Sequence, residues 1–141
     1  MKNEIDCAWK AGMVFEANVG GHRITMDVPG GDGDPGQGPS PKALLLATLA
    51  GCTGMDIVSI LKKMREPLTW FDMKVTGELS DEHPKRYTVY TITYRFLESD
   101  ALKRENVIKA ATLSMDKYCG VSASLRPGAA IDWAIEFIRS P

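Results

Sequence analysis

The chain has 141 residues, of which 44% are hydrophobic and 25% are charged, as in an ordinary globular domain. Its 17 basic and 18 acidic residues give a net charge of −1 and are spread along the chain, so we expect neither a nucleic-acid-binding patch nor an acidic tail. The longest apolar run, residues 43–51, is far shorter than a membrane span, and residues 1–10 contain no apolar signal core. We therefore predict one soluble, cytoplasmic domain over residues 1–141 that binds neither nucleic acid nor membrane.

The first quarter of the chain has the alternating apolar and polar residues of short strands. This period of two covers residues 5–10, 13–18 and 23–28, and glycine-containing turns separate the three segments. We expect a three-stranded meander. The glycine-rich segment 29–39 that follows is predicted to be a linker or a lid over a site.

One long helix is predicted over residues 40–66. Ser40 can cap it, and Pro41 suits its first position. Residues 43–50 are apolar almost all round, so we expect this half of the helix to be buried on every side. The pattern places Cys52 in the middle of the helix.

The remainder of the chain reads as two strands, a second helix and a last strand. The second helix has Ser99 or Asp100 as its expected cap and Cys119–Gly120 as its expected end. The resulting order, βββ-α-ββ-α-β, predicts an α+β fold in which an antiparallel sheet packs on two helices. The three predicted strands are residues 71–79, 87–96 and 131–137.

The three cysteines, Cys7, Cys52 and Cys119, form no CxxC pair and are too few for a disulfide scaffold. In a reducing compartment such residues are either packed in the core or reactive. We interpret Cys7 as a packing residue on the apolar face of the first strand. Cys52 has Thr48 and Asp56 one helical turn to either side, so polar groups accompany its thiol.

Two cysteine-containing segments give the sequence a family resemblance. PSPKALLLATLAGC, which ends at Cys52, and KYCGVSASL, which contains Cys119 67 residues later, resemble the OsmC/Ohr family of thiol peroxidases, closest to its OsmC-like branch. The resemblance covers nearly the whole chain, including the element order and the glycine-rich loop. It implies an OsmC-like fold and the reduction of organic hydroperoxides, in protection against oxidative or osmotic stress.

The resemblance also implies an assembly and a role for each cysteine. We expect an intertwined homodimer with its long helices packed centrally and two sites at the interface. Cys52 would be oxidised by the peroxide to a sulfenic acid, and Cys119 would resolve that acid to a disulfide. A small dithiol of the lipoyl type would then reduce the disulfide, and no flavin or haem is expected.

The chain departs from the family at the residues that activate the first cysteine. The family uses an arginine from the first hairpin, held by a glutamate ten residues before that cysteine; this chain offers Lys10 and Lys42 at these places. Lysine can stabilise a thiolate by charge but lacks the planar fork of arginine. Arg23 and Arg126 are possible substitutes.

Two other functions therefore stay open on the same fold. A protein with lysines in these two places could bind a small ligand without turnover, or could sense stress through its thiols. A metal site is not expected, because His22 and His83 are not spaced from a second ligand as a site would need.

Overall fold

The computed structural model describes residues 1–30 and 32–141, so Gly31 of the predicted glycine-rich loop lies outside the described residues. The described chain forms two compact units, Met1–Leu45 and Leu46–Pro141.

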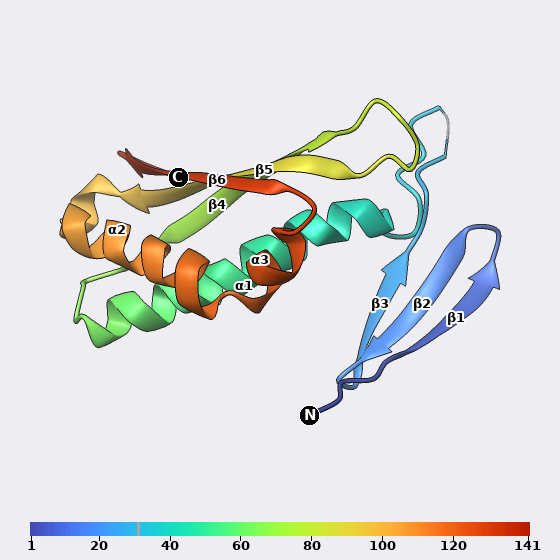
Figure 1. Ribbon diagram of the computed structural model, residues 1–141, viewed down its shortest axis with the longest axis horizontal. Helices are drawn as coiled ribbons and strands as arrows, with labels where there is room; N and C mark the ends of the chain where they lie inside the picture. The colour runs from blue at the N-terminus through green and yellow to red at the C-terminus, as the bar shows by residue number, and fades with distance from the viewer. Residues whose placement is uncertain (31) are drawn as a thin grey trace. The chain divides into compact units, whose positions relative to one another are not determined.

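The unit of residues 1–45 contains the predicted meander. Strands β1 (Asp6–Ala11), β2 (Val14–Val19) and β3 (His22–Met26) pair antiparallel in the order β1-β2-β3 (Figure 1). The turn between β2 and β3 uses Gly20 and Gly21, both at positive φ, which a glycine adopts without strain. The expectation of three strands is confirmed.

The apolar face of this sheet is largely exposed. Trp9 is 65% exposed and Phe15 is 42% exposed, although they are paired across β1 and β2. Cys7 is exposed as well, so its interpretation as a packed residue is wrong for the single chain. Three short strands cannot bury a face of their own without a second layer.

Helix α1 (Pro41–Lys63) begins where the sequence predicts it. The Ser40 hydroxyl accepts a hydrogen bond from the backbone N–H of Ala43 at 3.4 Å, as a cap does. The expectation that residues 43–50 are buried on every side is wrong, because Leu49 is the residue of this stretch that is fully buried. By length and composition alone α1 could also cross a membrane, but core helices of soluble proteins meet the same criterion.

The second unit contains a mixed sheet in the order β4-β5-β6. Strands β4 (Phe71–Leu79) and β5 (Tyr87–Leu97) pair antiparallel, whereas β6 (Ala130–Ile138) runs parallel to β5 (Figure 1). The α+β class is confirmed, but the expectation of one antiparallel sheet is corrected to two sheets with one parallel pair. The parallel pairing follows from the long helical connection between β5 and β6, which returns the chain to the start of the neighbouring strand.

That connection contains two helices where the sequence predicts one. Helix α2 (Arg104–Leu113) continues into a π-helical turn (Ser114–Tyr118), and helix α3 (Gly120–Leu125) follows. Gly120 therefore begins a helix and does not end one. The π turn interrupts the α-helical hydrogen bonds just before Cys119, which the residue pattern did not indicate.

The predicted cap of the second helix is also corrected. The carboxylate of Glu66 accepts a hydrogen bond of 3.0 Å from the backbone N–H of Lys103 and a second one from the side-chain amide of Asn106. A residue distant in sequence therefore caps α2. Asp100 accepts the backbone N–H of Thr69 at 2.7 Å instead. Both contacts depend on the position at which α1 ends, and the residues around α2 carry no information about that position.

The core of this unit lies between the sheet and the helices, which all cover one sheet face (Figure 1). The β-branched and aromatic residues on both faces of residues 87–96 predict a central strand covered on both sides. Strand β5 is central, but the helices cover one face, and alternate residues along the strand are buried. Most of the buried side chains come from three elements. They are Leu49, Ile57 and Leu61 from α1, Tyr90, Ile92, Tyr94 and Phe96 from β5, and Val107, Ala110 and Ala111 from α2; Leu102, Met115 and Cys119 complete the cluster.

We expect Gly77→Ala to destabilise the protein. A Cβ at Gly77 in β4 would lie 2.5 Å from the Tyr87 ring and 3.0 Å from a methyl of Leu46, so the ring must move. Overpacking of this kind costs about 1–3 kcal/mol. Urea unfolding of Gly120→Ala is the control, because no atom lies within 4 Å of its Cβ. Equal unfolding midpoints for the two variants would contradict this prediction.

Candidate functional site

The two cysteines that the sequence analysis paired lie side by side in the second unit. Cys52 is half-buried on α1, and Cys119 is 3% exposed at the end of the π turn. A hydrogen bond joins the two side chains, and both thiols are free. The fold therefore brings together two sulfurs that are 67 residues apart in the chain.

Local hydrogen bonds hold Cys119 at this position. Its backbone N–H donates to the carbonyl of Ser114 at 2.8 Å, which closes the π turn. Its sulfur accepts the backbone N–H of Ser122 at 3.4 Å, so Cys119 caps α3. The hydroxyl of Ser122 donates to the Cys119 carbonyl at 2.9 Å. Hydrogen bonds to a residue before it and to a residue after it in the sequence thus hold Cys119 in place.

The surroundings of Cys119 favour its protonated form. Burial raises the pKa of the Cys119 thiol, and the hydrogen bond with Cys52 raises it further. The backbone N–H of Ser122 acts in the opposite direction, because it stabilises a thiolate, but the net shift is upward. Cys119 is therefore held as a neutral thiol against the sulfur of Cys52.

A chain of buried hydroxyl groups runs next to the cysteine pair. The Thr53 hydroxyl lies 2.6 Å from the Tyr94 hydroxyl and 2.9 Å from the Ser114 hydroxyl. Ser114 donates in turn to the carboxylate of Asp56 at 2.8 Å. The sequence places Asp56 beside Cys52 but does not reveal the three hydroxyls, because they come from three different elements and no local motif marks them.

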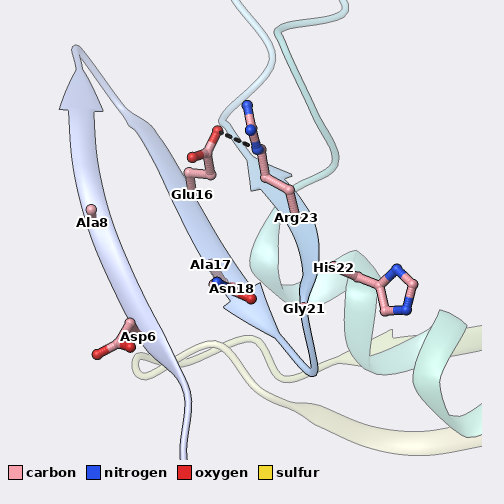
Figure 2. Close-up of a pocket in the computed structure, with 8 residues that line it drawn as sticks. All are labelled: Asp6, Ala8, Glu16, Ala17, Asn18, Gly21, His22 and Arg23. Atoms are coloured by element: carbon pink, nitrogen blue, oxygen red, sulfur yellow. Dashed lines mark ion pairs between the residues drawn. The ribbon is translucent and has the colours of Figure 1, made fainter.

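The predicted activating lysines both belong to residues 1–45. Glu16 on the central strand pairs with Lys10 at 3.5 Å and with Arg23 at 3.6 Å, on the polar face of the sheet. Glu16 and Arg23 line a hollow of about 340 Å³. Figure 2 shows the two side chains directed toward each other. Lys42 is exposed in the first turn of α1. The roles of Lys10 and Lys42 toward the thiols stay predictions.

Arg126, the other possible substitute, lies in the second unit. Its guanidinium donates to the backbone carbonyl of Met115 at 3.1 Å, which ties the end of α3 to the π turn. This contact gives Arg126 a structural partner next to the segment that carries Cys119.

Metal chemistry has no support in the described part of the chain. Among residues 1–30 and 32–141, no three side chains of His, Cys, Asp or Glu gather closely enough to hold an ion.

The fold and the paired thiols define a class of α+β proteins in which a long helix brings one cysteine against a second one beside a π turn. The family model of the OsmC-like proteins matches residues 31–134, and the chain belongs to the OsmC family. Protein YhfA of Escherichia coli strain K12 is 34% identical over 133 residues, which is 94% of this chain and 96% of that protein.

Solved structures show the same fold. A hypothetical protein from Aquifex aeolicus VF5 has a TM-score of 0.81 and 25% identity, with 98% of each chain covered. An OsmC-like protein from Mycoplasma pneumoniae has a TM-score of 0.83 and 15% identity, again with 98% of each chain covered.

We expect the buried hydroxyl of Tyr94 to make the protein less stable at alkaline pH. Burial raises the pKa of Tyr94 to about 12, the nearby Cys119 and Asp56 act in the same direction, and the hydrogen bond with Thr53 lowers it. Because the folded pKa exceeds the unfolded value near 10, this stabilisation is complete below pH ~10 and is lost as the pH rises through about 12. The loss amounts to about 3 kcal/mol.

The measurement is the free energy of unfolding in urea at a series of pH values above 9. Tyr94→Phe should remove this part of the alkaline loss, although it is less stable at neutral pH because the bond to Thr53 is gone. The exposed Tyr118 provides the control as Tyr118→Phe. Identical pH profiles for the wild type and Tyr94→Phe would contradict the assignment.

Proposed function

We propose that this protein is a thiol-dependent peroxidase that reduces organic hydroperoxides and protects the cell against oxidative or osmotic stress. The observation that carries the proposal is the contact between Cys52 and Cys119. Membership of the OsmC family supports a peroxide- or stress-related role.

The proposed reaction begins at Cys52. Its thiolate attacks an oxygen of the hydroperoxide, the O–O bond breaks, and the sulfur becomes a sulfenic acid. The alkoxide that leaves takes up a proton and departs as the alcohol. In the second step the Cys119 thiol displaces hydroxide from the Cys52 sulfur, the thiol proton leaves with the hydroxide as water, and a disulfide forms.

The different exposure of the two thiols supports this order. Cys52 is half-buried, so a peroxide can reach its sulfur, whereas Cys119 is buried and has a raised pKa. A thiol that stays protonated is a poor first nucleophile. In the second step the contact with Cys52 places the Cys119 sulfur next to its target, and the hydroxide that leaves takes up the thiol proton. The charge that would activate Cys52 is proposed to come from Lys10 and Lys42.

The reductant is proposed to be a small dithiol of the lipoyl type. Two thiol–disulfide exchanges return Cys52 and Cys119 to thiols and convert the dithiol to its cyclic disulfide. No further cofactor takes part in this scheme. The reaction fits the cytoplasm, the compartment that keeps thiols reduced.

The working form is proposed to be a homodimer. On α1, Met55 is 76% exposed and Val58 is 45% exposed, and they line an apolar hollow of about 610 Å³ together with Phe71 and Met73. Exposed apolar side chains that gather around one hollow are typical of an interaction site. A second copy of the chain is the partner that the family resemblance implies.

One observation favours a second candidate, a thiol sensor or small-ligand-binding protein without turnover. Lys42 stands where the family has its glutamate, and Glu16 pairs with Lys10 within the first unit. If these lysines do not activate Cys52, the cysteine pair would still form a disulfide in response to oxidants but would consume little peroxide.

We expect Cys52→Ser to abolish the reduction of cumene hydroperoxide, because serine is a far weaker nucleophile than a thiolate. Cys119→Ser should complete one turnover and stop as a sulfenic acid that dimedone traps. Peroxide consumption in the presence of dihydrolipoamide is the measurement, and the exposed Cys7 gives the control as Cys7→Ser. Turnover by Cys52→Ser would overturn the proposal. Disulfide formation in the wild type without peroxide consumption would favour the sensor.

Val58→Lys should convert the proposed dimer to a monomer, because the dimer interface would bury the lysine charge on the apolar face of α1, where it cannot be solvated. Light scattering coupled to gel filtration measures the mass. Ile108→Lys is the matched control, since Ile108 is 41% exposed on α2, outside the residues that line the hollow. A monomeric wild type, or a Val58→Lys variant that stays dimeric, would reject this interface.

A further inference from the structure

The buried hydroxyl chain connects the two elements that carry the cysteines. Thr53 follows Cys52 directly on α1, and Ser114 opens the π turn whose carbonyl bond holds the backbone of Cys119. The hydrogen bond of 2.9 Å between Thr53 and Ser114 therefore joins the two elements. It lies one residue from Cys52 and one turn from Cys119.

The hydroxyl chain lies in the interior of the protein, so its hydrogen bonds constrain how the elements that it joins are aligned. Thr53, Ser114 and Tyr94 have no exposed surface. In the absence of water, a hydroxyl that loses its partner finds no replacement, and its bonds are stronger than they would be in solvent. Apolar packing alone would allow α1 to slide against the π turn, whereas these bonds fix one alignment.

The carboxylate of Asp56 sets the direction of every bond in the chain. Because a carboxylate can only accept, Ser114 spends its single proton on Asp56 at 2.8 Å. Ser114 can then only accept from Thr53, and Thr53 can only accept from Tyr94. A neutral carboxyl group can also donate a hydrogen bond. Protonation of Asp56 would therefore allow the hydrogen bonds of the hydroxyl chain to reverse their direction or to break.

Asp56 can exchange protons with solvent. It lines a hollow of about 390 Å³ on the surface of the second unit. The titratable groups around it are Lys63 on α1, Lys109 on α2, Tyr118 on the π turn and, through the hydroxyl chain, Tyr94 on β5. Asp56 is the carboxyl group of this set.

We propose that Thr53 and Ser114, oriented by the carboxylate of Asp56, are positioning residues that align the Cys52 and Cys119 sulfurs and make formation of their disulfide depend on the protonation of Asp56. As a part of the catalytic cycle this inference rests on the proposed function. The alignment itself can be measured without any peroxide.

The test is the equilibrium between the Cys52–Cys119 disulfide and the two thiols in buffers of reduced and oxidised glutathione, measured by alkylation and peptide mass spectrometry. Thr53→Val keeps the shape of the side chain but removes its hydroxyl, and we expect it to lower the equilibrium constant for the disulfide about tenfold, a rise in reduction potential of about 30 mV. Ser114→Ala should behave in the same way.

Three variants separate alignment from packing. Thr53→Ser restores the hydroxyl and should stay within about twofold of the wild type, as hydroxyl-dependent positioning requires. Ser124→Ala, which removes an exposed hydroxyl of α3, should have no effect. A Thr53→Val constant equal to that of the wild type, or a Thr53→Ser constant as low as that of Thr53→Val, would overturn the proposal. If Ser114→Ala fails to fold, the two Thr53 variants decide.

The role of Asp56 is read from the pH dependence. In the wild type the disulfide constant should fall as the solution becomes acidic. Asparagine, like a neutral carboxyl, can donate or accept, so Asp56→Asn should show the low constant already at pH 7 and a flat profile. Asp116→Asn, at an exposed acid in the π turn, is the control and should follow the wild type. A wild-type profile for Asp56→Asn would overturn the coupling.

The two proposals fail in different ways. If the wild type forms the disulfide in glutathione buffer but does not consume hydroperoxides, the peroxidase function is wrong and the positioning role is still decided by the variants. If hydroperoxides are consumed and all the hydroxyl variants match the wild type, the positioning role is wrong and the peroxidase function stands.

Discussion

The contact between the thiols of Cys52 and Cys119 is the constraint on which the site depends. A disulfide needs its two Cα atoms within about 7 Å, so the helix and the π turn that carry these residues must pack directly together. Apolar burial brings them close, and the buried hydrogen bond between Thr53 and Ser114 selects one alignment. Breaking a buried bond of this kind costs about 1–3 kcal/mol, enough to define a single arrangement.

Exposed apolar surface is the second feature that shapes the molecule. Trp9 and Phe15 are exposed on the first sheet, and Met55 and Val58 are exposed on α1, although each belongs to a regular element with a clear apolar face. The periodicity that predicts such a face says that something covers it, but not what. A homodimer, as proposed, would remove these side chains from water and would explain why the half of α1 that is apolar all round is not buried in the single chain.

Much of the fold could be predicted from local pattern. Local strand patterns predicted all of β1 to β6, and Ser40 with Pro41 located the start of α1, because these signals act within a few residues. The parallel pairing of β6 and the cap of α2 by Glu66 could not be predicted, since both depend on where a distant segment lies. The π turn was hidden for a different reason, because its residues would equally suit an unbroken helix.

The sequence by itself determined the family: two cysteine segments at a characteristic separation carry the resemblance, and the apolar helix around Cys52 follows from composition. The tertiary structure decided how the two cysteine segments are arranged. Only the folded chain places Cys119 against Cys52 and joins Thr53 to Ser114, 61 residues away. The reason is physical: a hydrogen bond between distant segments is fixed by the packing of the entire core, so no local pattern of residues can encode it.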